Sequence, residues 1–246
     1  HQDKVAFISI MHSNNEVGTI QDIAKIVKIA GDIPVHADCV QSFGKVELSF
    51  KDLGLTAATI SAHKVGGPLG VAALILKRGL DIEPILHGGG QERDIRSGTF
   101  NAPSIVSFAA AAKESVAAIT DRDKNVRALK SELIQTVKKN VSDAWVNGDQ
   151  TNCLPGITSI TFPKTDSEGL LLLLDSEGIA CSTGSACSAG VQRPSHVLLA
   201  MGLTEDETTS TLRFSVSHSN TVTEIAKLGS VIASVVARSR AASGKK

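Results

Sequence analysis

The sequence predicts an α/β protein of two domains, the first of which has a parallel sheet. Short apolar runs rich in β-branched residues first alternate with amphipathic helical patterns. A long helical stretch then fills the middle of the chain, and strand and helix patterns alternate again to the end. A strand, a helix and a second strand in close succession are typical of a βαβ unit, whose two strands lie parallel. The sequence therefore indicates a parallel sheet with a helical crossover.

The first βαβ unit is expected near the start of the chain. Residues 5–11 (VAFISIM) form an apolar run with the composition of a strand. Residues 20–30 carry isoleucine, valine and alanine at helical spacing, and Gly31 follows them as a helix stop. Residues 33–38 (IPVHAD) resume a short strand. These three segments predict two parallel strands joined by one helix.

Two further strands and two long helices are expected next. The apolar runs 57–61 (AATIS) and 71–77 (VAALILK) lie on either side of a glycine-rich loop. Residues 104–118 then give an alanine-rich helical pattern, and residues 121–139 give a charged amphipathic one. We place the domain boundary inside this helical stretch.

The predicted domains are residues 1–115 and residues 116–246. The second half alternates short strand and helix patterns, and its last residues, 241–246 (AASGKK), are expected to be a frayed tail. Strands are expected at 156–162, 179–182 and 211–216, and helices at 169–178, 194–202 and from 222 onward.

Composition excludes several classes of protein. The 246 residues hold 25 basic and 25 acidic side chains, so net charge gives no basis for binding nucleic acid. No apolar run is long enough to span a bilayer, and no signal sequence opens the chain, so we expect no membrane association. The four cysteines form no CxxC knuckle, which favours a reducing, cytoplasmic location. Because the chain begins at His1 and soon enters an apolar run, we interpret it as a fragment or processed product.

Polar clusters follow three of the predicted strands: HSNNE after the first, HADCVQ across the second and SAHK after the third. Ligands bind at the carboxyl ends of strands in open parallel sheets. Each cluster alone has a structural explanation, such as a turn, a helix cap or a satisfied core histidine. Lys64 follows an apolar run, so we expect it to be buried and to need a partner. Together the clusters suit one ligand with a phosphate, a ring nitrogen and a carbonyl.

Five ordered motifs carry a family resemblance: MHSNNEVG, HADCVQ, SAHKVGGPLG, HGGGQERDIRSGT and STGSACS. In this order and with these gaps, they resemble the cysteine desulfurases of the class V aminotransferase group, the NifS/IscS-like enzymes that use pyridoxal 5'-phosphate. The resemblance covers essentially the whole chain and begins partway through the family's cofactor domain. It implies a fold-type I pyridoxal-phosphate-dependent transferase. Residues 1–115 would then be the C-terminal part of the large, parallel-rich α/β domain, and residues 116–246 the smaller C-terminal α+β domain with the catalytic cysteine loop.

The resemblance assigns roles around the cofactor ring. Lys64 matches the lysine that forms the Schiff base with the cofactor aldehyde, a chemistry for which lysine is the usual residue. Asp38 matches the carboxylate that faces the pyridine nitrogen and keeps it protonated. Asn15, preferred over its neighbour Asn14, and Gln41 match the groups that hydrogen-bond the ring hydroxyl side.

Three more residues match phosphate ligands of the family. Ser61 and His63 supply a hydroxyl and an imidazole, both of which can donate hydrogen bonds to a phosphate. Thr99 matches a residue that reaches the cofactor phosphate of the neighbouring subunit. The resemblance therefore implies a homodimer in which two chains complete each site.

The segment CSTGSACSAG, residues 181–190, contains the expected sulfur nucleophile. Its small residues and glycines suit a mobile loop with a reactive thiol, and the resemblance selects Cys187 rather than Cys181. Cys181 continues a strand-like run, which favours core packing, and a zinc site at these two cysteines is disfavoured by their spacing. Arg213, in TLRFSV, matches the arginine that binds the substrate carboxylate, and its structural alternative is a salt bridge at a strand end.

The implied reaction converts L-cysteine to L-alanine and leaves a persulfide on Cys187 for a sulfur acceptor in iron–sulfur cluster assembly or thiolation. Two alternatives share these residues: a selenocysteine lyase and an aminotransferase of the same fold. A third is an inactive fragment that serves only as an interaction module. In relatives, the part preceding this match supplies a phosphate loop and a ring-stacking histidine. A sheet without its first strands is expected to expose apolar surface and an unpaired edge.

Overall fold

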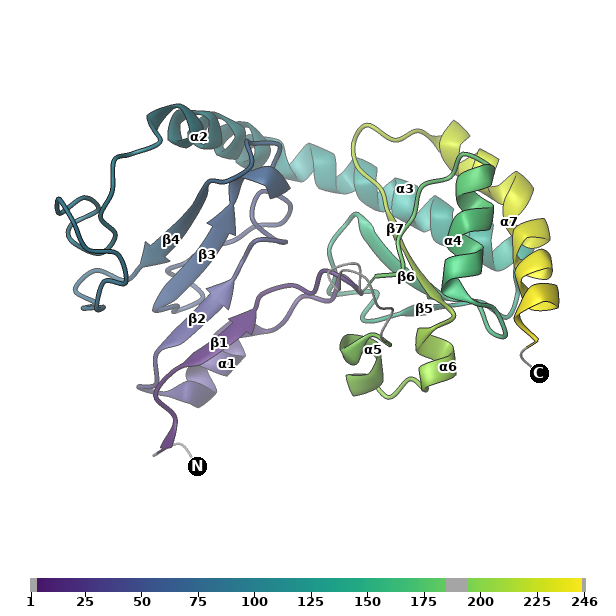
Figure 1. The fold of residues 1–246 in the computed structure, drawn as a ribbon, viewed down its shortest axis with the longest axis horizontal. Coiled ribbons are helices and arrows are strands. Elements are labelled where there is room, and N and C mark those ends of the chain that lie inside the picture. The colour runs from purple at the N-terminus through teal and green to yellow at the C-terminus, as the bar shows by residue number, and fades with distance from the viewer. Residues whose placement is uncertain (1–3, 185–193, 245–246) are drawn as a thin grey trace. The chain divides into compact units, whose positions relative to one another are not determined.

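The computed structural model describes residues 4–184 and 194–244. The chain forms two compact units, drawn together in Figure 1. The first comprises His1–Ser13 and Gln21–Thr120, and the second comprises Asn14–Ile20 and Asp121–Lys246. The units are therefore not contiguous in the sequence, because a seven-residue loop near the start of the chain packs with the C-terminal half.

The first unit contains a four-stranded sheet in the order β1-β2-β3-β4. Its strands are β1 (Ile8–Met11), β2 (Val35–Asp38), β3 (Ala57–Ser61) and β4 (Ala72–Leu76), and α1 (Ile23–Ala30) connects the first two. β1, β2 and β3 are mutually parallel, and β4 is antiparallel to β3, as the directions of the arrows in Figure 1 show. The predicted βαβ unit is confirmed, and β1 is an edge strand.

Local signals explain where α1 begins and ends. The Asp22 side chain accepts a hydrogen bond from the backbone N of Lys25 and so satisfies one of the free donors at the helix start. The helix ends at Gly31, whose φ of 62° lies in the left-handed region that favours glycine. Ile23 and Ala30 on its inner face are buried. Gly31 therefore acts as the helix stop that the sequence predicts.

The sheet buries one face and presents polar side chains on the other. Val35 and Ala37 of β2 and Ala58 of β3 belong to a core that also holds Ile23. On the alternate positions, His36 Nδ1 lies 2.8 Å from Ser9 Oγ and His36 Nε2 lies 2.8 Å from Thr59 Oγ1. Both ring nitrogens of His36 thus have partners on neighbouring strands. His36 therefore fits the structural explanation of a histidine whose hydrogen bonds are satisfied within the fold.

The helix α2 (Ala102–Ala117) completes the first unit. Asn101 caps it by accepting from the backbone N of Ser104, and proline occupies its first turn, where a missing N–H is tolerated. The buried Phe108 packs edge to face against Phe43, with ring centroids 6.4 Å apart. α2 begins at Ala102, two residues before the start of the predicted helix.

The second unit is an antiparallel sheet with helices. The inter-strand order is β5-β6-β7. Its core includes Phe162, Leu212 and Ile232, which are all fully buried. No helix within the described residues is long and apolar enough to cross a membrane. The strands are β5 (Trp145–Asn147), β6 (Ile157–Thr161) and β7 (Thr211–Ser215), and the helices are α3 (Ile119–Asn140), α4 (Ser167–Ser176), α5 (His196–Ala200), α6 (Glu205–Thr208) and α7 (Val222–Ser243).

Two expectations for this half are wrong, and two elements were not predicted. Residues 179–182 form no strand, because only Ser182 makes a bridge, to Arg213 of β7. The tail is not frayed from residue 241, because α7 continues to Ser243 and ends at the left-handed Gly244. The short elements β5 and α6 lack the length that a periodic pattern needs to be recognised.

Candidate functional site

The carboxyl ends of β1, β2 and β3 form one edge of the first unit's sheet. Met11 pairs with Asp38, and the backbone N of His12 donates to the Asp38 carbonyl at 2.8 Å. The backbone N of Cys39 donates to the Thr59 carbonyl at 2.9 Å. The strand register therefore places the segment after β2 and the segment after β3 at the same edge, where open parallel sheets bind ligands.

Asp38, the predicted partner of a ring nitrogen, is exposed at this edge. Its Oδ1 accepts a hydrogen bond from the backbone N of Val40 at 2.9 Å, which holds the carboxylate at the start of a turn. Gln41, on the same turn, accepts from Lys45 Nζ through its Oε1 at 3.2 Å. The turn thus presents a carboxylate and an amide beside the end of β3.

Ser61 and His63 lie within hydrogen-bond distance of each other. Ser61 Oγ is 2.8 Å from His63 Nδ1; Ser61 is buried and His63 is exposed. One of the two groups donates to the other, and the pair keeps a further O–H or N–H donor for an anion. Their chemistry fits the phosphate that the sequence motif predicts.

Lys64 ends the short 3-10 helix η2 (Ala62–Lys64) and is exposed, so the expectation of a buried amine is wrong. The preceding apolar run alternates between the core and the open face of the sheet, and the strand ends at Ser61. The backbone N of Gly67 then returns to the Ala62 carbonyl at 2.9 Å, which closes a turn that brings Lys64 to the surface. The amine is accessible to a carbonyl ligand without the penalty of burying a charge.

Thr99 is exposed in the segment between β4 and α2, which contains neither helix nor strand. Gln91 Oε1 accepts from the backbone N of Gly98 at 2.9 Å, one position before Thr99. Non-glycine residues adopt left-handed backbone conformations just before it, at Glu92, Arg93 and Asp94. The role of Thr99 toward a neighbouring subunit stays a prediction.

Arg213 and Asn15 both belong to the second unit and are in contact there. Arg213, on β7, donates from Nη1 to the Asn15 carbonyl at 2.9 Å. Its Nε is buried and has no partner among the described residues, and no carboxylate in that part of the chain lies within salt-bridge distance of it. An arginine fork with an unused donor suits an anion such as a carboxylate. The alternative of a strand-end salt bridge finds no partner in the described residues.

The loop Asn14–Ile20 is held by its own side chains. Asn14 Oδ1 accepts from the backbone N of both Glu16 and Val17, at 2.8 and 2.9 Å. Glu16 Oε2 accepts from Ser195 Oγ at 2.6 Å, and both residues are buried. Asn14 thus serves the loop itself, and the preference for Asn15 as a cofactor ligand stays a prediction.

The thiols differ in what the structure reveals of them. The predicted nucleophile Cys187 lies outside the described residues. Burial, followed by the nearby charge of Asp175, raises the pKa of Cys181 to about 11, and Cys181 packs against the core of the second unit. Burial is also the first cause that raises the pKa of Cys39 to about 11. Neither thiol is a thiolate near neutral pH, so neither has the reactivity of a nucleophile.

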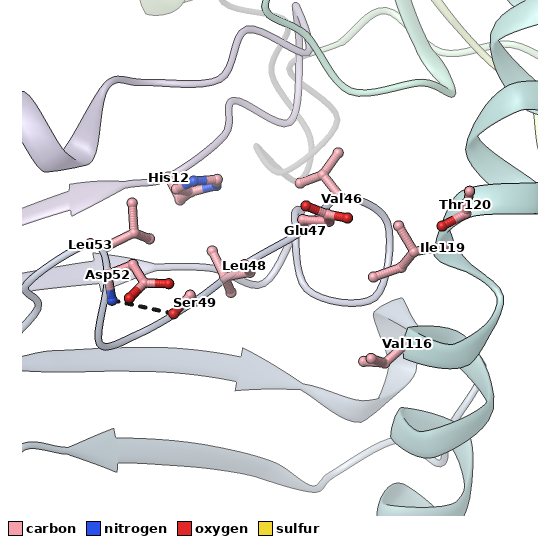
Figure 2. Close-up of a pocket in the computed structure, with 10 residues that line it drawn as sticks. All are labelled: His12, Val46, Glu47, Leu48, Ser49, Asp52, Leu53, Val116, Ile119 and Thr120. Atoms are coloured by element: carbon pink, nitrogen blue, oxygen red, sulfur yellow. Dashed lines mark hydrogen bonds between the residues drawn. The ribbon is translucent and has the colours of Figure 1, made fainter.

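A pocket of about 530 Å³ lies in the first unit, apart from the predicted cofactor residues. Figure 2 draws the residues that line it. His12 contributes to it, is 5% exposed and has an Nδ1 with no partner among the described residues. The sequence analysis placed this histidine in the HSNNE cluster but gave it no role, because a polar residue after a strand gives no sign of how deeply it is buried. The pocket is lined by His12, Val46, Glu47, Leu48, Ser49, Asp52, Leu53, Val116, Ile119 and Thr120.

Burial lowers the pKa of His12 below its ordinary value of 6.5, so the folded chain binds fewer protons than the unfolded chain in mild acid. Stability of the first unit is therefore expected to fall as pH drops below 6.5, and His12→Gln should flatten that decline. Hydrogen exchange of first-unit peptides near neutral pH and at about pH 5 measures this. The exposed His218 gives the control variant His218→Gln, which should keep the parental decline. An equal decline in His12→Gln would contradict the assignment.

Several known proteins resemble this chain in sequence and in structure. The aminotransferase class-V family matches residues 1–228. An IscS-like cysteine desulfurase of Mycobacterium tuberculosis is 42% identical over 243 residues, 98% of this chain and 62% of that protein. The solved structure of a NifS-like protein from Rickettsia africae is 37% identical with a TM-score of 0.82 and covers 93% of this chain and 61% of that one. A structure of SspA in complex with cysteine is 31% identical with a TM-score of 0.67, over 88% of this chain and 61% of that one.

The chain thus spans about three-fifths of the length of these relatives. For three cysteine desulfurase relatives, the share of their length that it covers is 60 to 62%. The likeness confirms the predicted fold-type I α/β architecture, because the NifS-like structure superposes over nearly all of this chain. From its sequence match and its fold, the chain belongs to the aminotransferase class-V family.

Proposed function

We propose that this chain carries cysteine desulfurase chemistry, in which L-cysteine becomes L-alanine and its sulfur passes to Cys187. The observation that carries the proposal is the grouping of Asp38, Ser61, His63 and Lys64 at the carboxyl edge of the parallel strands. Relatives that are about two-fifths identical bear the name cysteine desulfurase, which supports this choice over other chemistries of the family.

The residues at this edge suit pyridoxal 5'-phosphate, which supplies an electron sink for charge at the substrate α-carbon when it is bound. The Ser61 and His63 pair would hold the phosphate, and Asp38 would hold the ring nitrogen protonated. Asn15 and Gln41 would hydrogen-bond the ring hydroxyl side. In a homodimer, Thr99 of one protomer would reach the phosphate bound by its partner.

The remaining chemistry falls to residues of this chain. Arg213 would bind the substrate carboxylate through the donor that is unused in the described residues. The Lys64 amine, which is exposed, can remove and return the α-carbon proton. The Cys187 thiolate would attack the substrate sulfur. An S–S bond would form as the bond between this sulfur and the substrate β-carbon breaks, and the β-carbon would take a proton. Cysteine and one thiol thereby give alanine and one persulfide, with all atoms balanced.

Cys187 would then pass its sulfur to an acceptor protein. IscS-named relatives support an acceptor in iron–sulfur cluster assembly, with thiolation as the other use. The structure of SspA with cysteine supports the same substrate for this chain. We place the protein in the cytoplasm, and the unpaired thiols of Cys39, Cys153 and Cys181 among the described residues are compatible with a reducing location.

The test is a covalent trap on the chain itself. Pyridoxal 5'-phosphate is added, the mixture is reduced with borohydride, and the labelled lysine is located by peptide mapping. The label is expected on Lys64, with little on the exposed Lys51. Label spread over surface lysines without preference for Lys64 would overturn the assignment.

Sulfur transfer is tested with Cys187→Ser. This variant is expected to keep the Lys64 label and to lose persulfide and sulfide formation from cysteine, because serine has no sulfur to accept the transferred atom. Cys181→Ser is the matched control and should retain the parental rate. A Cys187→Ser variant that released sulfide at the parental rate would refute the nucleophile, and it would favour a different reaction of the same family.

A further inference from the structure

The carboxylate of Glu16 lies next to residues on both sides of the sequence segment that contains Cys187. Glu16 is 6% exposed, and its Oε2 accepts a hydrogen bond from Ser195 Oγ at 2.6 Å. A Cβ on Gly184 would lie 3.5 Å from the same oxygen atom. Residues 185–194 lie between these two neighbours in the sequence. The two ends of this segment therefore meet at one carboxylate oxygen.

The loop that carries Glu16 is fixed to the strand that carries Arg213. Arg213 Nη1 donates to the carbonyl of Asn15, the residue before Glu16, at 2.9 Å. The Arg213 backbone N donates to the Ser182 carbonyl at 2.6 Å, and the Ser182 backbone N donates to the Arg213 carbonyl at 3.1 Å. Strand β7 thus holds the Glu16 loop and the residues just before Gly184 beside the arginine proposed for the substrate carboxylate.

Ser195 links the Glu16 carboxylate to helix α5. Its hydroxyl donates to Glu16 and accepts from the backbone N of Leu198 at 3.2 Å, which caps the helix. Ser195 is 4% exposed, so water does not compete for these hydrogen bonds. Buried glutamates are usually paired, yet no basic side chain among the described residues lies within salt-bridge distance of Glu16. In that part of the chain, a serine hydroxyl takes the place of a cation.

We propose that Glu16 is a positioning residue for Cys187, because it holds both ends of the segment in which that cysteine lies. Cys187 is three positions after Gly184, so the placement of Gly184 limits where the thiol can reach. A misplacement of about 1 Å can cost about 100-fold in rate. The effect on sulfur transfer rests on the proposed function, whereas the contacts of Glu16 with the two ends do not.

Hydrogen exchange tests the contacts on the chain without any cofactor. In Glu16→Ala, peptides that cover residues 179–184 and 194–200 are expected to exchange about 10-fold faster or more, because both lose the group that holds them. Peptides from α4 should keep the parental rate, which a general loosening of the second unit would not allow. Glu16→Gln keeps an amide oxygen that can accept from Ser195 Oγ, so most of the protection should remain.

Two controls accompany these variants. Glu168 is exposed on α4 of the same unit, so Glu168→Ala should leave exchange of both peptides unchanged. The fluorescence of Trp145, the single tryptophan, shows whether the second unit is folded in each variant. Parental exchange of both peptides in a folded Glu16→Ala variant would overturn the inference.

Sulfur transfer tests the consequence for the reaction. Single-turnover formation of persulfide on Cys187 from L-cysteine should fall by about 10-fold or more in Glu16→Ala. Glu16→Gln should stay within about 3-fold of the parent, because it keeps the acceptor for the serine hydroxyl. The loss should appear in kcat with little change in KM, and the borohydride label on Lys64 should be unchanged, since neither cofactor nor substrate binding depends on this contact.

Substitutions of Ser195 test the same hydrogen bond from its other side. Ser195→Ala should reproduce the loss of persulfide formation seen in Glu16→Ala, and Ser195→Thr, which keeps the hydroxyl, should restore the parental rate. When both alanine substitutions are combined, the loss should be no greater than the larger single loss, because both remove one interaction. Losses that multiply would show that the two residues act independently, and they would overturn the inference.

The two proposals fail separately. If the parent chain shows no label on Lys64 and forms no persulfide, the proposed function falls, and hydrogen exchange alone decides whether Glu16 holds the two ends. If the parent forms persulfide and Glu16→Ala forms it at the same rate, the proposed function stands and the positioning role of Glu16 falls.

Discussion

Replacing Arg213 with methionine is expected to lower kcat/KM for L-cysteine by about 100-fold, because removing one partner of a charge-assisted pair costs several kcal/mol. On the proposed function, the guanidinium binds the substrate carboxylate, and its Nε has no other partner among the described residues. Cofactor labelling of Lys64 should be unchanged. Steady-state alanine formation measures the loss.

Two comparisons separate binding of the carboxylate from support of the fold. Arg213→Lys keeps the charge but not the planar fork, so a smaller loss of about 10-fold is expected. Cysteamine lacks the carboxylate, and its rate should be equal in the parent and in Arg213→Met. Arg213 also donates to the Asn15 carbonyl, so hydrogen exchange in Asn14–Ile20 reports any loosening of that loop. A parental kcat/KM for cysteine in Arg213→Met would contradict the assignment.

Replacing Phe162 with alanine is expected to destabilise the second unit by about 3 to 5 kcal/mol, the usual range for removal of a fully buried aromatic ring. Phe162 is 0% exposed and directly follows β6. Its ring centroid lies 6.3 Å from that of Phe214 at an interplanar angle of 69°, an edge-to-face contact that the substitution also removes. Urea unfolding measures the change in the free energy of unfolding.

The sequence provides its own probe and control for this measurement. Trp145 is the single tryptophan and lies on β5 of the same unit, so its fluorescence reports unfolding of that unit. Phe100→Ala is the matched control: Phe100 is 53% exposed, and a change within about 0.5 kcal/mol is expected there. A loss below about 1 kcal/mol for Phe162→Ala would show that the site collapses around the missing ring or is not packed as described.

Local chemistry explains why several elements were predictable. Asp22 and Gly31 bound α1 as a cap and a helix stop, and both act through groups within one turn of the helix. At the start of α7, the Thr221 side chain and Glu224 form a reciprocal capping box. Interactions between residues three or four positions apart can be inferred almost directly from the sequence.

Long-range packing explains what was missed. Lys64 was expected to be buried because an apolar run precedes it. Residues in a strand alternate between two faces, however, so an apolar strand does not determine whether the turn after it is buried. A Cβ on Gly44 would lie 3.0 Å from Val65 Cγ1, so the loops that follow two different strands pack closely there. The packing of Asn14–Ile20 with the C-terminal half likewise joins residues far apart in the chain, as in Glu16 with Ser195.

The sequence by itself determined the family, the βαβ order and the side chains gathered at the carboxyl edge, because motif order and strand direction are properties of the linear chain. Only the tertiary structure decided that Lys64 is exposed and that Arg213 contacts the Asn15 carbonyl. Exposure and an unused donor are set where distant segments pack together, and no local pattern records them.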